Sequence, residues 1–275
     1  MSALAREREV AVQAAREAGA IVRRYYEGRV EAREKRPDNP VTAADLEANA
    51  HIRRLIAAAF PDDGWLSEET ADSTERLGRR RVWVVDPLDG TKEFIQHIPE
   101  FCVCVALTEE GRPVVAVEYN PAADRLYVAV RGAGTTVNGA PARVSTTARV
   151  PDAVVLASRS EDKRSEWDPF KSRVHVRLTG SVAFKLAELA TGNGDATFTL
   201  TPKNEWDICA GTLLVEEAGG RVTDLHGRPL LFNQASPLRP GMIATNGVLH
   251  DGLLALIAEV APGQGLDLAK SRPRT

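Results

Sequence analysis

The sequence has little that would suit an oxidising compartment, a membrane or a nucleic acid. Only three cysteines occur in 275 residues, which indicates neither a disulfide framework nor a zinc site. Cys102 and Cys104 alternate within FCVCVAL, as small core residues on one strand face would. No stretch approaches about eighteen consecutive apolar residues, so no membrane-spanning helix is expected. The formal charge of −3 gives no basic excess, which argues against a long nucleic-acid duplex as partner.

The chain also lacks a recognisable secretory signal, a repeat and a linker. The N-terminal stretch MSALAREREV is charged and has no apolar core, so we expect a cytoplasmic protein. No Gly/Ser-rich or Pro-rich segment divides the chain. We therefore expect an N-terminal half at residues 1–150 and a C-terminal half at 151–261 that pack as one body, followed by a dispensable tail at 262–275.

What is present is a change of pattern along the chain. Two stretches with a helical spacing of apolar residues come first, ending near Gly28 and Pro61, with the polar loop EAREKRPDNP between them. From residue 82, apolar runs separated by turn residues predict an antiparallel meander: VWVVD, FCVCVAL, VVAVEY and RLYVAV. Beyond about residue 150, strand-like and helix-like runs mix, which predicts an α/β unit.

Residues 83–94, WVVDPLDGTKEF, end an apolar strand in two carboxylates, Asp86 and Asp89. Asp-Pro and Asp-Gly are ordinary turn sequences, so these aspartates could simply shape a turn. Alternatively, Pro87 restricts the backbone so that both carboxylates converge, and two adjacent carboxylates favour a cation such as Mg²⁺ between them. Gly90 and Thr91 would then offer a flexible backbone and a hydroxyl to a bound anion. These residues alone leave both interpretations open.

Further acidic stretches add candidates with the same ambiguity. GWLSEET contains Glu68 and Glu69, VTAADLE contains Asp45, and EWDICAG contains Asp207. Asp45 fits a capping box with Thr42 at a helix start. Asp207 suits the first turn of a helix, where the helix dipole favours an acidic side chain. Each of these two aspartates therefore has a structural explanation beside a functional one.

Taken together, SEET, WVVDPLDGT and WDICAG, in this order and at these separations, resemble the Mg²⁺-dependent, lithium-sensitive phosphatases of the inositol monophosphatase superfamily. The resemblance runs from the first helix to about residue 258. It implies an α+β fold, a layered α-β-α-β-α sandwich. The continuation TKEF after DPLDG, the stretch PVTAAD and the SRS at 158–160 are most similar to the 3′(2′),5′-bisphosphate nucleotidases, which remove the 3′-phosphate of adenosine 3′,5′-bisphosphate.

The resemblance implies a role for each matched residue. The shell of two or three Mg²⁺ ions would comprise Glu68, Asp86, the backbone carbonyl of Leu88, Asp89 and Asp207. Catalysis would use Asp45, Thr91 and Glu68, with Asp45 and Thr91 positioning and deprotonating the attacking water. The substrate would be bound by Gly90, Thr91, Ser158, Arg159, Gly180, Ser181 and Lys185. Glu69 is expected behind the ligands or in a structural role, and Lys92 is either a solvated turn residue or a phosphate contact.

The choice of substrate is less defined. Inositol-specific members carry a sugar-binding glutamate seven residues before the WD aspartate, where this chain has Leu200, and this difference argues against inositol recognition. Bacterial bisphosphate nucleotidases often place an arginine near this point, where this chain has Thr199, and this difference argues against high nucleotide specificity.

We expect an enzyme that acts on a small phosphorylated metabolite, first adenosine 3′,5′-bisphosphate. Inositol monophosphate, fructose 1,6-bisphosphate and histidinol phosphate are alternatives with the same metal chemistry. A non-catalytic regulatory protein on the same scaffold is the alternative of another class. We expect a monomer or homodimer with neither a membrane nor a long nucleic acid as partner.

Overall fold

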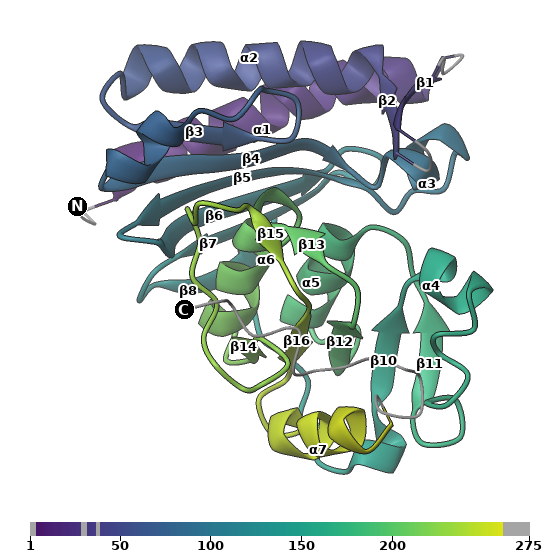
Figure 1. The fold of residues 1–275 in the computed structure, drawn as a ribbon. Coiled ribbons are helices and arrows are strands. Elements are labelled where there is room, and N and C mark those ends of the chain that lie inside the picture. Colours follow the sequence, from purple (N-terminus) through teal and green to yellow (C-terminus); the bar gives the residue numbers. More distant parts are fainter. Residues whose placement is uncertain (1–3, 29–31, 37–38, 261–275) are drawn as a thin grey trace.

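The computed structural model describes residues 4–28, 32–36 and 39–260 and arranges them in alternating layers of helix and sheet (Figure 1). The α-helices of these residues are α1 (Ala5–Tyr26), α2 (Ala43–Ala59), α3 (Thr91–Ile95), α4 (Arg159–Lys163), α5 (Val182–Ala190), α6 (Glu205–Glu217) and α7 (His250–Val260). Two short 3₁₀ helices lie at Thr74–Gly78 and Val150–Asp152.

The larger sheet has seven strands in the order β3-β4-β5-β6-β7-β8-β9. These strands are β3 (Gly64–Ser67), β4 (Arg81–Asp89), β5 (Cys102–Glu109), β6 (Arg112–Asn120), β7 (Arg125–Val130), β8 (Gly134–Val137) and β9 (Ala140–Ala142). From β4 to β9 each strand pairs antiparallel with the next, whereas β3 runs parallel to β4. The predicted antiparallel meander is therefore confirmed.

The smaller sheet has five strands in the order β11-β10-β12-β16-β14. Its strands are β10 (Val154–Ala157), β11 (His175–Leu178), β12 (Ala196–Thr199), β14 (Arg221–Thr223) and β16 (Met242–Thr245). Two further strand pairs are small: β1 (Ala32–Arg36) with β2 (Asn39–Thr42), and β13 (Lys203–Asn204) with β15 (Leu238–Arg239). Parallel and antiparallel pairs mix in the five-stranded sheet, as expected for an α/β unit.

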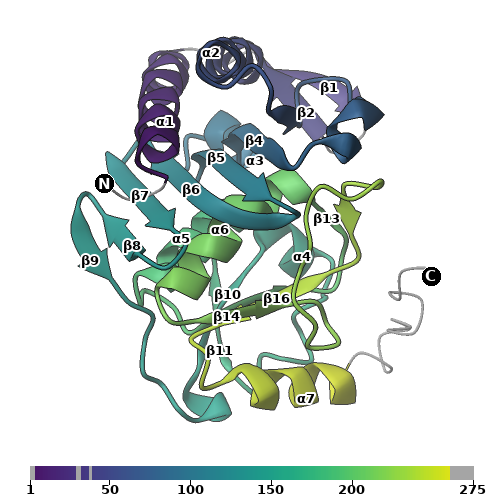
Figure 2. The same cartoon turned by 90° about the vertical axis from the view of Figure 1, so that its left-hand side faces the viewer.

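The layers follow from which faces are apolar. Helices α1 and α2 cover the outer face of the seven-stranded sheet, α5 and α6 lie between the two sheets, and α7 covers the far face of the five-stranded sheet (Figures 1 and 2). Three buried apolar clusters fill the interfaces between these layers. The layered α-β-α-β-α sandwich expected from the sequence is confirmed.

The loop predicted between the first two helices is instead partly a hairpin. Ala32 pairs with Thr42 and Arg33 with Val41 in an antiparallel ladder that a polar, proline-bearing sequence gives little reason to expect. Pro40 is tolerated there because the pair has no third strand and Pro needs an edge position. The predicted tail at 262–275 lies outside the described residues.

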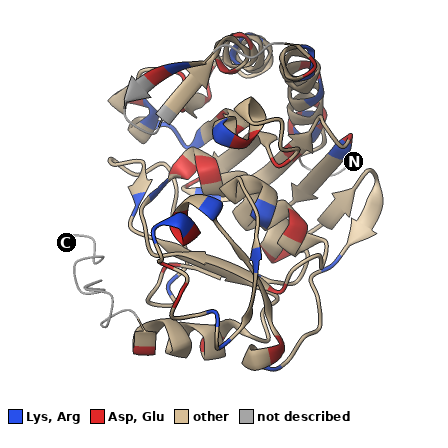
Figure 3. Cartoon of the chain, turned by 90° about the vertical axis from the view of Figure 1, so that its right-hand side faces the viewer, with Lys and Arg blue, Asp and Glu red and all other residues tan. Residues whose placement is uncertain are grey.

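Charges of both signs are spread over the visible side of both halves (Figure 3). Within the described residues, no helix is long and apolar enough to cross a membrane. All three cysteines are buried and free, as expected for core residues.

Candidate active site

The alternation of β4 decides where the first aspartate points. Val82 and Val84 belong to the apolar cluster around α5 and α6, whereas Trp83 and Val85 belong to the cluster under α1 and α2. Asp86 continues the face of Val82 and Val84, because side chains two residues apart share a face of a strand. The strand therefore ends by directing a carboxylate toward the helices between the sheets.

A bulge in β4 then places the second aspartate on the same face. Asp86 lies opposite Cys104 and Asp89 lies opposite Cys102, so three steps along β4 match two steps along β5. Without the extra residue, side chains three apart would point to opposite faces of the sheet. The Pro87 segment thus does more than turn the chain, since it brings two carboxylates to one side.

The third carboxylate comes from the start of α6. Asp207 is the third residue of that helix, and its Oδ2 accepts a hydrogen bond from the Asn204 amide at 2.9 Å. Asp86, Asp89 and Asp207 each offer a carboxylate oxygen, and these three oxygens all lie within 4.8 Å of one another. Residues far apart in sequence therefore converge on one point.

The carboxylates of this cluster have raised pKa values. Burial raises the pKa of Asp86 well above its usual range, and neighbouring negative charges, first that of Glu68, raise it further. Burial also raises the pKa of Asp207, helped by the charges of Asp89 and Glu68. For Asp89, burial raises the pKa although hydrogen bonds from the start of α5 oppose it. Such carboxyls keep their protons to a higher pH than usual unless a cation offsets their charge.

Asp45 forms the predicted helix cap and also contacts Thr91. Its Oδ2 accepts the Thr42 amide at 2.8 Å and the Thr42 hydroxyl at 2.6 Å, so the predicted capping box exists. Its Oδ1 lies 3.2 Å from the hydroxyl of Thr91, which also lies 3.1 Å from the carbonyl oxygen of Leu88. A hydroxyl has one proton to donate, so it serves one of these acceptors at a time. The cap thus uses Oδ2 of Asp45, whereas Oδ1 is the oxygen beside Thr91.

The three clustered aspartates, Leu88 and Thr91 line one open cavity of about 410 Å³, a size suited to a small metabolite. Asp45 is not among the lining residues, because it is buried beside Thr91. The side chains and backbone around the cavity come from both halves of the chain. They are Pro40, Glu68, Asp86, Leu88, Asp89, Gly90, Thr91, Lys92, Glu93, Ser158, Ser160, Ser181, Val182, Lys185, Lys203, Asn204 and Asp207.

Gly90 is required by the crowding at this point. Its φ of +94° is in the left-handed region, and an added Cβ would lie 2.8 Å from the carbonyl oxygen of Glu100. Ser181 occupies another unusual conformation, with φ 52° and ψ 129°. Its hydroxyl donates to Asp89, and the Ala183 amide donates to the same oxygen of Asp89 at 2.8 Å. The turn into α5 thus holds one carboxylate of the cluster in place.

Two residues predicted to contact substrate meet a glutamate instead of lining the cavity. The guanidinium of Arg159 donates to both carboxylate oxygens of Glu100, one of them at 2.9 Å. The amide of Gly180 donates to the same carboxylate at 2.5 Å. Glu69 lines a separate groove beside α2, with residues such as Asn49 and Arg53. The other predicted substrate residues, and Lys92, are among those around the cavity.

Sequence reasoning missed several residues of the cavity wall, above all Glu93, Ser160, Lys203 and Asn204. Glu93 lies in the TKEF stretch and Ser160 in the SRS stretch, so the motif around each residue could have indicated a place at the cavity. Lys203 and Asn204 directly precede EWDICAG, and only the position of the turn into α6 brings them to the cavity.

The carboxylate cluster suits a hard divalent cation. Its donors are all oxygens, and Mg²⁺ prefers oxygen ligands, commonly one or two carboxylates together with substrate phosphates. A bound cation would relieve the mutual repulsion that raises the pKa values of Asp86 and Asp207. The donor set therefore fits Mg²⁺.

Comparison with known proteins gives the same assignment. The sequence matches the model of the inositol monophosphatase family over residues 4–261. It is 38% identical to the Nus factor SuhB of Escherichia coli over 229 residues, which covers 79% of this chain and 85% of that protein. It is 35% identical to the inositol-1-monophosphatase of Mesorhizobium japonicum, with 90% and 94% covered, and 33% identical to the histidinol-phosphatase of Chlorobaculum parvum, with 90% and 95% covered.

A solved structure shows the same fold. The inositol monophosphatase of Anabaena (Nostoc) sp. PCC 7120 aligns with a TM-score of 0.77 and 31% identity, covering 92% of this chain and 95% of that one. The similar proteins named above are a SuhB protein, inositol monophosphatases and a histidinol-phosphatase rather than bisphosphate nucleotidases, so only the broader part of the predicted resemblance is confirmed. The chain belongs to the inositol monophosphatase family and is a metal-dependent phosphoric monoester hydrolase.

Proposed function

We propose that the cavity hydrolyses the phosphate monoester of a small polar metabolite with two or three Mg²⁺ ions held by Glu68, Asp86, the carbonyl of Leu88, Asp89 and Asp207. The convergence of three aspartate carboxylates within 4.8 Å at the cavity carries this proposal. Bound Mg²⁺ would supply charge neutralisation at the attacking and leaving oxygens of the phosphate. From the family resemblance we also expect inhibition by Li⁺.

In this proposal the chain's own residues prepare the nucleophile. Asp45 accepts a proton through Oδ1, the oxygen not used in the cap, and Thr91 orients the attacking water through its hydroxyl. The pairing of these two side chains, one from α2 and one from α3, supports this division of roles. The amides of Gly90 and Thr91 bind phosphate oxygens, and Ser158 and Ser181 border the leaving group.

Inositol 1-phosphate and related polyol phosphates are the first substrate candidates, because two of the named relatives above are inositol monophosphatases. Histidinol phosphate is supported in the same way by one relative. Neither Leu200 nor Thr199 is among the residues around the cavity. These two positions, which distinguish inositol-specific members from bisphosphate nucleotidases in the family resemblance, therefore favour neither substrate.

Adenosine 3′,5′-bisphosphate remains a second candidate, because one observation favours it. Lys185 reaches the cavity with its side chain almost fully buried, and a second phosphate would give such a cation a partner. We also propose that the enzyme works as a monomer or homodimer.

The test is a phosphate-release panel in Mg²⁺ with inositol 1-phosphate, histidinol phosphate, fructose 1,6-bisphosphate and adenosine 3′,5′-bisphosphate. We expect metal-dependent release from at least one compound, and the highest kcat/KM would identify the substrate class. No release from any compound, with Mg²⁺ present and the protein folded, would contradict the proposal and favour a non-catalytic role.

A further inference from the structure

Part of the cavity wall is basic, in contrast to the carboxylate cluster. Lys185 in the first turns of α5 and Lys203 in β13 both line the cavity that the aspartates line. Lys185 is 2% exposed, although lysine is among the residues least often buried. The two lysines come from separate segments, so their meeting at one wall is a property of the fold.

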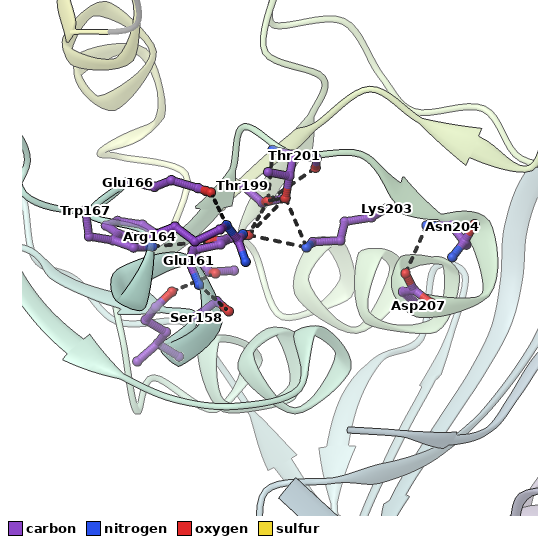
Figure 4. A network of polar contacts seen from close by, with 12 residues as sticks. Ser158, Glu161, Arg164, Glu166, Trp167, Thr199, Thr201, Lys203, Asn204 and Asp207 are labelled. Atoms are coloured by element: carbon purple, nitrogen blue, oxygen red, sulfur yellow. Dashed lines mark hydrogen bonds and ion pairs between the residues drawn. The ribbon is translucent and has the colours of Figure 1, made fainter. Parts of the chain in front are cut away.

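One buried carboxylate, that of Glu161 in α4, holds this wall together (Figure 4). Its Oε1 accepts the hydroxyl of Thr199 at 2.7 Å and lies 3.3 Å from the ammonium of Lys203. Its Oε2 accepts the indole N–H of Trp167 at 3.2 Å. Both oxygens of Glu161 are therefore used, and the carboxylate is fixed in one orientation.

Figure 4 shows Lys203 extending between this network and the segment that carries Asn204 and Asp207. Besides Glu161, its ammonium has the hydroxyl of Thr201 at 3.3 Å. Both contacts are at the long end of the hydrogen-bond range, and the side chain is 22% exposed. The ammonium of Lys203 thus has donor capacity left for a ligand in the cavity.

Close partners for the two ammonium groups are few at this wall, although the charges of Asp89 and Glu93 also favour the charged form of Lys185. Glu161 is the carboxylate that most favours the charged form of Lys185, and it also pairs with Lys203, so two ammonium groups share one carboxylate. In the part of the chain that the structure describes, no hydrogen bond or ion pair reaches the ammonium of Lys185. Burial accordingly lowers the pKa of Lys185. A buried cation without a partner is costly, and a bound anion would offset the cost.

We propose that Lys185 and Lys203 form a second anion subsite, so that the preferred substrate carries an acidic group, phosphate or carboxylate, in addition to the ester phosphate that is hydrolysed. The proposal rests on the proposed function, because it concerns the substrate of the same cavity. Arg159 is a weaker candidate for this role, since Glu100 already neutralises it through two hydrogen bonds. The competing explanation is that Lys185 only offsets the charge of Asp89 and Glu93, which also face it.

The experiment measures kcat/KM in Mg²⁺ for matched pairs of substrates that differ in the second acidic group. Adenosine 3′,5′-bisphosphate is compared with adenosine 3′-monophosphate, and fructose 1,6-bisphosphate with fructose 1-phosphate. The pair 2-phosphoglycerate and glycerol 2-phosphate tests a carboxylate in place of a second phosphate. The wild type is expected to prefer the doubly acidic member of at least one pair by about 10-fold or more.

The variants Lys203→Gln and Lys185→Met are expected to reduce this preference ratio by about 10- to 100-fold, the loss expected for one charge-assisted hydrogen bond. Met keeps the apolar length of the lysine stem, and a thermal melt checks that each variant is folded. Lys163→Gln, which removes an exposed lysine of α4 outside the cavity wall, is the matched control and should leave the ratio unchanged.

Failure of this inference and failure of the proposed function give different results. If the wild type hydrolyses none of the compounds, the proposed function fails. If it hydrolyses them without preferring a doubly acidic member, or if both lysine variants slow both members of a pair equally, the second subsite is overturned while the phosphatase stands. If Lys185→Met leaves the preference ratio unchanged but lowers the Mg²⁺ concentration needed for half-maximal activity, Lys185 only offsets the charge of the acidic side chains, and the second subsite is overturned.

Discussion

The cavity has two differently built parts, a carboxylate cluster and a lysine wall. A strand bulge places Asp86 and Asp89, the Ala183 amide and the Ser181 hydroxyl at the start of α5 hold Asp89, and a helix cap holds Asp207, so backbone geometry largely fixes the cluster. Lys203 is held by side chains around Glu161, which itself comes from another segment, and Lys185 is influenced by the charge of the same carboxylate. Chemistry shared by a family is thus tied to the backbone, whereas the part proposed to select the substrate depends on side chains that can be replaced singly.

The largest effect should come from removing one carboxylate. Asp89→Asn is expected to lower kcat/KM by about 10³- to 10⁵-fold, because metal stabilisation of the transition state is worth several kcal/mol. Phosphate release at saturating Mg²⁺ measures this fall in kcat/KM. Asp251→Asn, whose side chain is 86% exposed on α7, is the matched control and should retain activity. If the Asp89→Asn enzyme were fully active, the carboxylate cluster would not be needed for catalysis, and the contrast drawn here with the lysine wall would be wrong.

Asp45→Asn should lower kcat by about 10²- to 10⁴-fold, the usual contribution of a general base. The Mg²⁺ concentration for half-maximal activity should change much less, because Asp45 is assigned to the water rather than to the metal. Asn can still accept the Thr42 amide, so the helix cap is retained and the melting temperature should change little. Full activity in this variant would leave Asp45 with capping alone.

Glu161→Gln tests whether the carboxylate of Glu161 controls the charge of Lys185 in the lysine wall. Glu161 raises the pKa of Lys185, and burial lowers it, so removal of the carboxylate should lower that pKa further. Lys185 would then lose its proton at a lower pH, and the alkaline fall of kcat/KM for a doubly acidic substrate should move to lower pH. At alkaline pH the loss should be about 10-fold. An unshifted pH profile would show that Lys185 does not respond to Glu161.

The smallest effect concerns stability without metal. Burial and neighbouring charges raise the pKa of Asp86 in the folded state, so the folded chain binds more protons than the unfolded chain above the ordinary aspartate pKa. Stability of the metal-free protein therefore falls as pH rises through that range. Asp86→Asn should raise its melting temperature in EDTA at neutral pH, by about 2–4 °C per kcal/mol, and much less near pH 4. A lower melting temperature would contradict the repulsion inferred for the cluster.

Most of the carboxylate cluster was predictable because short-range sequence encodes it. Asp86 and Asp89 stand in one motif, and the turn interpretation and the metal interpretation proved compatible, since the bulge at Pro87 aligns both side chains. The cap at Asp45 and the first-turn position of Asp207 were likewise visible in sequence. They did not exclude a place for Asp207 at the cavity or a contact of Asp45 with Thr91. The layered fold was predictable from the order of helical and strand patterns together with the family resemblance.

Of the lysine wall only Lys185 was predicted, because long-range partners decide the rest. Nothing near Arg159 in the sequence indicates that Glu100, 59 residues away, would take its charge. Lys203 looks like a solvated residue until the turn before α6 is placed beside Glu161. The β1–β2 hairpin was missed for a related reason, because polar residues and Pro40 suggested a loop.

The most direct test of the carboxylate cluster is the Mg²⁺ dependence of phosphate release by the wild-type protein. With the best substrate of the panel, activity should be abolished by EDTA and restored by Mg²⁺, and a fixed Mg²⁺ concentration should support less activity as the pH falls, because protons compete for Asp86 and Asp207. Full activity in EDTA would contradict the assignment of these aspartates to metal-dependent hydrolysis.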